Sequence, residues 1–76
     1  MTLEEMDKIL HDLFGDNFYQ FAFYQSPGEH VGLQNPWVKV ETDPKTGRYL
    51  AWQSTTEPTL EANFLRCVEM IKEDKL

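Results

Sequence analysis

The sequence predicts a single α+β domain over residues 1–76, with the order α-β-β-β-α. In this fold a three-stranded antiparallel meander carries both helices mainly on one face. Three observations predict it. Apolar residues recur at intervals of three and four near both ends of the chain. In residues 37–42 and 48–53, large apolar residues occupy every second position, as they do on the core side of a strand, and a segment with proline and glycine joins the two stretches. A length of 76 residues suits one modest core.

The first helix is predicted over residues 2–14. Thr2 and Glu5 have the spacing of a capping box, in which each residue satisfies a free backbone amide of the other. Gly15 follows, where a helix often ends on a left-handed residue. The apolar stripe comprises Leu3, Met6, Leu10 and Leu13, and it is widened by Ile9 and Phe14.

Residues 18–25, FYQFAFYQ, predict a strand because they are rich in aromatic residues and too few for a further helix. One face carries Tyr19, Phe21 and Phe23, and the other carries Phe18, Gln20, Ala22 and Tyr24. Neither face is plainly polar. Residues 26–36 show no clear hydrophobic periodicity, so neither a helix nor a strand is assigned to them.

Residues 37–42 and 48–53 predict two strands of a hairpin, joined by the turn sequence of residues 43–47, DPKTG. Val38, Val40, Leu50 and Trp52 are expected to face the core. The alternation places Trp37, Lys39, Glu41, Tyr49, Ala51 and Gln53 on the second face.

A second helix is predicted from Thr56, Glu57 and Pro58 to the end of the chain, with proline in its first turn. Its apolar stripe comprises Leu60, Phe64, Cys67, Val68 and Ile71. Both helices therefore have an apolar side for the sheet.

The net charge of −6 resides on the two helical ends of the chain. Residues 1–16 hold five acids against Lys8, residues 17–56 are neutral, and residues 57–76 hold five acids against three bases. Binding to a phosphate backbone needs clustered Lys and Arg. Double-stranded RNA-binding domains share this order of elements, but residues 55–63, TTEPTLEAN, are acidic where such a domain needs bases. We therefore expect no direct contact with nucleic acid.

The sequence favours the cytoplasm. Cys67 is the one cysteine, so no intramolecular disulfide forms, and small secreted domains usually have several. The N-terminal MTLEEMDKIL is acidic where a signal peptide is basic, and no apolar run reaches the roughly 18 residues of a membrane span. The chain begins with Met1 and ends soon after a helical pattern, which favours a complete short protein.

No pattern in the sequence indicates catalysis, a metal or a cofactor. His11 lies beside Asp12 and His30 lies in the irregular segment, but no nucleophile accompanies either histidine. Cys67 belongs to an apolar stripe, where a buried thiol is the usual state. The histidines lack zinc spacing, and no glycine-rich phosphate loop is present.

The aromatic residues on the second face of the sheet are the main functional indication. Phe18 or Tyr24, together with Trp37 and Tyr49, are expected to lie near one another and beside Lys39. Glu4, Asp7 and Asp12 on the first helix complete the predicted partner-binding residues. The alternative is internal cover, in which residues 25–36 fold back over these rings or one helix covers each face.

Two functional hypotheses follow. In the first, the protein is a stoichiometric inhibitor or adaptor of a larger cytosolic protein with a basic surface, as small acidic inhibitors of nucleic-acid enzymes, immunity-type or phage-borne, are. In the second, it is a structural or regulatory homodimer whose sheets pack face to face, with no foreign target.

Overall fold

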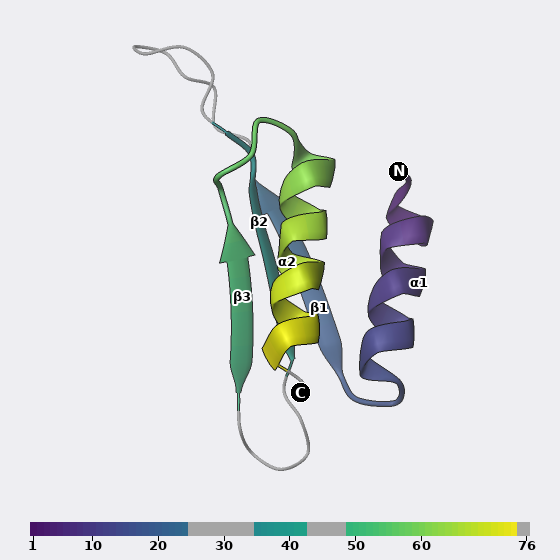
Figure 1. The fold of residues 1–76 in the computed structure, drawn as a ribbon. Helices are drawn as coiled ribbons and strands as arrows, with labels where there is room; N and C mark the ends of the chain where they lie inside the picture. The colour runs from purple at the N-terminus through teal and green to yellow at the C-terminus, as the bar shows by residue number, and fades with distance from the viewer. Residues whose placement is uncertain (25–34, 43–48, 75–76) are drawn as a thin grey trace.

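The predicted α-β-β-β-α order and α+β class are confirmed. The computed structural model describes residues 1–24, 35–42 and 49–74. The elements are α1 (Leu3–Phe14), β1 (Tyr19–Tyr24), β2 (Trp37–Thr42), β3 (Leu50–Ser54) and α2 (Leu60–Asp74). The strands form one antiparallel sheet in the order β1-β2-β3. Both helices lie on one side of it and run in the same direction (Figure 1). The predicted turn at 43–47 and most of segment 26–36 lie outside the described residues.

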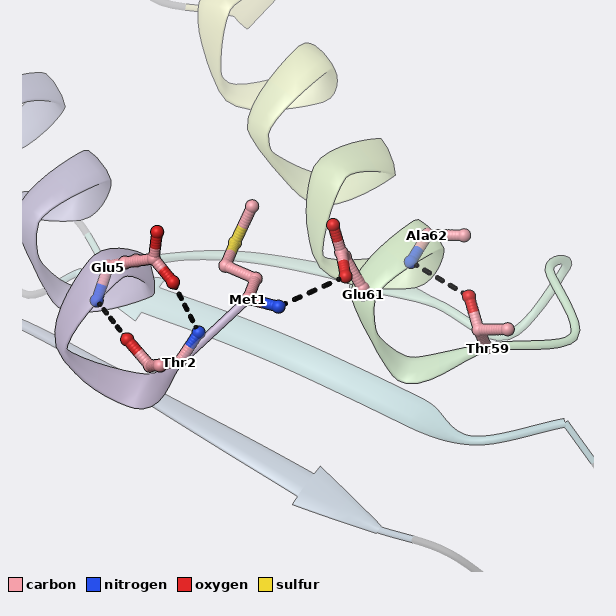
Figure 2. A network of polar contacts seen from close by, with 6 residues as sticks. All are labelled: Met1, Thr2, Glu5, Thr59, Glu61 and Ala62. Carbon is pink, nitrogen blue, oxygen red and sulfur yellow. Dashed lines mark hydrogen bonds and ion pairs between the residues drawn. The ribbon is translucent and has the colours of Figure 1, made fainter.

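Helix α1 begins with the predicted capping box. The Glu5 amide donates to Thr2 Oγ1 at 3.1 Å, and the Thr2 amide donates to Glu5 Oε1 at 2.7 Å (Figure 2). The helix ends at Gly15, which has a φ of 62° and donates its amide to the carbonyl of His11. Glycine adopts this left-handed φ without steric strain.

Helix α2 begins later than the sequence predicts. We expected a start at Thr56, Glu57 and Pro58, but the first helical residue is Leu60. The Asn63 side chain accepts from the Glu57 amide and donates to the Glu57 carbonyl, both at 2.9 Å, which holds residue 57 outside the helix. Thr59 Oγ1 accepts from the Ala62 amide at 3.1 Å and caps the helix instead (Figure 2).

The starts of the two helices meet at one end of the molecule. The Met1 ammonium lies 3.3 Å from Glu61 Oε2, in the first turn of α2 (Figure 2). Parallel helices bring two positive dipole ends together, and acids in the first turns offset this charge. Glu4 and Glu5 hold the equivalent positions in α1.

The core fills the space between the sheet and the two helices. Its buried hydrophobic residues are Met6, Leu10, Phe14, Val38, Val40, Trp52, Phe64, Cys67, Val68 and Ile71. Tyr19, Phe21 and Phe23 pack against them and are half-buried. This placement confirms the predicted core side of all three strands, except for one residue of β3.

That exception is Leu50, which was expected in the core and is 38% exposed. Trp52, two residues further along β3, donates from Nε1 to Asp74 Oδ2 at 2.6 Å, and Asp74 is the last residue of α2. Leu50 therefore lies beyond the end of the helix that covers the rest of the strand. Leu3 is also exposed, because it begins α1 ahead of the first core residue, Met6.

Candidate protein-binding site

The surface that the sequence singled out is the side of the sheet opposite the helices, which we call the far face. Alternation along the strands places there Gln20, Ala22, Tyr24, Trp37, Lys39, Glu41, Ala51 and Gln53, with Phe18 and Tyr49 just outside β1 and β3. No helix or strand among the described residues packs on this face, since the buried side chains of both helices belong to the core on the other side.

One end of the far face is an aromatic pair. Tyr24 and Trp37 are register partners of β1 and β2, and their rings stack with centroids 4.5 Å apart and planes 28° apart. Trp37 Nε1 donates to Gln53 Oε1 on β3 at 2.8 Å. Tyr24 is 52% exposed. The pair is thus held from two strands and presents apolar ring surface to the outside.

The opposite end holds Tyr49 and Phe18, and both are exposed. The Tyr49 hydroxyl donates to the Glu41 carboxylate, which confirms that Tyr49 lies on the far face. Phe18 is fixed at its backbone, where its carbonyl accepts from Thr42 Oγ1 at 2.6 Å.

The structure corrects the expectation of a single aromatic group. Glu41, the partner of Tyr49, lies four residues along β2 from Trp37, which is about 13 Å in a strand. Tyr24 and Trp37 come together as predicted, whereas Tyr49 belongs to the other end. The far face therefore carries aromatic residues at both ends and none in the middle.

The middle of the far face is polar and electrically neutral. Lys39 Nζ lies 3.8 Å from Glu41 Oε1, and both side chains are half-buried among their neighbours. Sequence reasoning did not assign Glu41 or Gln53 to the site. Strand alternation had nevertheless placed both residues on this face, and in the structure Gln53 is the register partner of Lys39.

The predicted acidic residues lie on the helical layer. Glu4 and Asp12 are exposed on α1. Asp7 is also exposed, and its Oδ1 accepts from the Tyr19 hydroxyl at 2.6 Å. This hydrogen bond, with burial and the negative charge of Asp7, raises the pKa of Tyr19 to about 12. The predicted partner-binding residues are thus divided between two opposite surfaces, an aromatic sheet face and an acidic helical layer.

Cys67, which the apolar stripe predicts to be a buried thiol, lies in the core. Cys67 is fully buried, and its thiol donates to the Val38 carbonyl at 3.7 Å. Burial raises the pKa of the Cys67 thiol to about 11, so the thiol stays protonated at neutral pH and is a poor nucleophile.

The structure describes residues 1–24, 35–42 and 49–74. No group of three or more His, Cys, Asp or Glu residues there is placed to hold a metal ion. One open depression of about 530 Å³ lies beside α2, lined by Thr56, Glu57, Ala62, Leu65, Arg66 and Glu69. Its one basic group is already neutralised, because Arg66 Nη1 donates to Glu69 Oε2 at 3.1 Å. Over the described ranges, no helix combines the length and the apolar character of a membrane span.

The chain matches no family model, and searches of curated proteins and of solved structures found no match.

Proposed function

We propose that this protein is a small protein-binding module of the cytosol, acting as a stoichiometric inhibitor or adaptor of a larger protein that has a basic surface. Its far face makes the contact, and its acidic helical layer steers the approach. Proteins that process nucleic acids are one class of partner that carries such basic surfaces.

The observation that carries this proposal is the stacked Tyr24–Trp37 pair at the end of the far face. Tyrosine and tryptophan are the residue types most enriched in interface hot spots. A pair that stacking and the Trp37–Gln53 hydrogen bond already hold in place loses little side-chain entropy on binding. Such pre-ordered aromatic surface suits an anchor for a partner.

The acidic residues act at a distance in this proposal. Glu4 and Asp12 lie on the helical layer, so a partner seated on the far face does not touch them. The net charge of −6 nevertheless attracts a basic protein during diffusion and orients it before contact. The neutral far face then allows close packing without burial of unpaired acids.

The experiment compares capture of partners from native cytosol by the tagged wild-type protein and by Trp37→Ala. We expect a captured basic protein to bind Trp37→Ala more weakly by about 2 kcal/mol or more, because the anchor is lost. Tyr49→Ala tests the other aromatic end in the same way. The matched control is Leu65→Ala, which removes an exposed apolar side chain from α2 on the helical side and leaves capture unchanged.

Stability is measured on the same variants by urea unfolding. Trp37→Ala should change the free energy of unfolding far less than a core substitution such as Phe64→Ala, which costs about 3 to 5 kcal/mol. Equal capture by wild type and Trp37→Ala would contradict the proposal, as would a loss of capture that merely follows a loss of fold.

A further inference from the structure

We propose that in the free protein the far face is covered by the far face of a second copy, in an antiparallel two-fold arrangement that sets Lys39 of each copy against Glu41 of the other. The inference concerns the surface used in the proposed function. It does not depend on a foreign partner.

The far-face residues form rows across the three strands. Tyr24 and Trp37 form the first row, and Ala22, Lys39 and Gln53 form the second. Gln20, Glu41 and Ala51 form the third, and Phe18 and Tyr49 lie two residues beyond Gln20 and Ala51, each one residue outside its strand. Read along the strands, the rows are aromatic, basic, acidic and aromatic.

This order is self-complementary. A two-fold axis that lies between the sheets and runs across the strands, level with Val40, reverses the row order of the second copy. The basic row of each copy then faces the acidic row of the other copy. Each aromatic end faces the other aromatic end, so that Tyr24 and Trp37 lie over Phe18 and Tyr49 of the second copy. The two sheets have the aligned geometry common in packed sheets, about 10 Å apart.

The alternative two-fold axis runs along the strands and is disfavoured by charge. It keeps the row order, so Lys39 faces Lys39 and Glu41 faces Glu41 across the interface. Like charges set against each other in a desolvated contact oppose association. The charge order therefore selects the antiparallel arrangement.

Charge also favours a dimer interface through the far face over one through the helices. Its described residues sum to zero, because Lys39 and Glu41 are its two charged groups. The helical ends of the chain, in contrast, carry the whole net charge of −6, so two helical layers repel each other.

The size of the face sets the strength of the dimer. Three strands spaced about 4.8 Å apart and about 20 Å long offer roughly 300 Å² per copy. A standard stable interface buries about 800 Å² per partner. We therefore expect a weak dimer with a dissociation constant on the order of 100 µM, which a tighter partner displaces from the same face.

The test uses sedimentation of the full chain from about 10 µM to about 1 mM, with charge variants that separate the two arrangements. Wild type should shift from monomer to dimer across this range. Lys39→Glu makes both middle rows acidic and Glu41→Lys makes both basic, so each variant alone should dimerise at least about tenfold more weakly. An equimolar mixture of the two variants should form a heterodimer. The double variant, which exchanges the two charges, should dimerise as wild type does.

Circular dichroism checks that each variant keeps the fold, and the double variant guards against a general effect of substitution. A wild-type protein that stays monomeric at about 1 mM overturns the inference. So do single variants that dimerise as wild type does, or a mixture that forms no heterodimer.

The proposed function fails by a different result, namely equal capture of foreign partners by wild type and Trp37→Ala. A monomeric protein that loses its partner on Trp37→Ala would retain the proposed function and reject the dimer.

Discussion

Asn63 is a fully buried amide whose hydrogen bonds join α2 to the sheet and to the segment before the helix. Its Oδ1 accepts from the Ser54 hydroxyl and the Glu57 amide, and its Nδ2 donates to the carbonyls of Pro36 and Glu57. Among the described residues, no buried side-chain nitrogen or oxygen lacks a hydrogen-bond partner. A satisfied buried amide of this kind fixes one arrangement of the elements that it links.

We expect Asn63→Ala to lower the free energy of unfolding by about 2 to 4 kcal/mol, because it leaves the buried partners of the amide unsatisfied. Urea unfolding followed by circular dichroism measures this change. The matched control is Asn17→Ala at an exposed position, which should cost less than about 0.5 kcal/mol. Equal effects of the two substitutions would show that the Asn63 hydrogen bonds contribute little.

Tyr19 and Cys67 make the stability sensitive to alkaline pH. Their pKa values in the folded protein are raised, to about 12 from 10.0 for Tyr19 and to about 11 from 9.0 for Cys67. The folded state therefore keeps protons that the unfolded chain releases. The resulting stability is complete below about pH 9 and is lost as the pH rises through 11 and 12.

We expect the free energy of unfolding to fall steadily when urea titrations are repeated between about pH 8 and about pH 12. Tyr19→Phe should remove the share of the fall that Tyr19 contributes between about pH 10 and about pH 12 and leave the share from Cys67, since phenylalanine has no proton to release. A free energy of unfolding that is constant up to about pH 11 would contradict the prediction.

At the scale of the elements, the position of a leucine relative to the ends of the helices decides how much it contributes to the free energy of unfolding. Leu10 lies in the middle of α1 and is 0% exposed, whereas Leu50 begins the edge strand β3 beyond the end of α2. Both occur at positions that the apolar pattern assigns to the core.

We expect Leu10→Ala to cost about 2 to 5 kcal/mol of unfolding free energy and Leu50→Ala less than about 1 kcal/mol. The same atoms are removed in both variants, so the comparison isolates burial. Thermal and urea unfolding of the pair measure it. A larger loss for Leu50→Ala would mean that β3 is covered more fully than the structure shows.

At the scale of the whole molecule, the acids of α1 and the aromatic residues of the far face lie on opposite sides. In the proposed function, the acids therefore act on a partner through the long-range electric field, which salt screens, and the aromatic residues act after contact.

For a captured basic partner, we expect the association rate to fall by about tenfold between roughly 20 and 200 mM salt. Neutralising α1 with Glu4→Gln and Asp12→Asn should slow association at low salt and leave dissociation unchanged. Trp37→Ala should instead speed dissociation. Surface plasmon resonance measures both the association and the dissociation rate. An association rate that does not respond to salt would exclude steering by the acidic layer.

Much of the fold could be predicted because local patterns carry it. The capping box at Thr2 and Glu5 forms as expected, and the strand alternation correctly assigns the two faces of the sheet. The start of α2 was predicted wrongly because the Asn63 side chain holds Glu57 outside the helix by two hydrogen bonds. These bonds form only after the tertiary fold has positioned Asn63. Local preference at Thr56 and Pro58 could not show this.

The sequence by itself determined the order of elements, the faces of the strands and the acidic character of the helical layer, since all three depend on spacing along the chain. The tertiary structure alone decided the register, and with it the separation of Trp37 from Tyr49 and the row order of the far face. Register arises from pairing between distant strands, and a shift of two residues would preserve the alternation while moving every row. The arrangement that makes the far face self-complementary therefore comes from these long-range pairings.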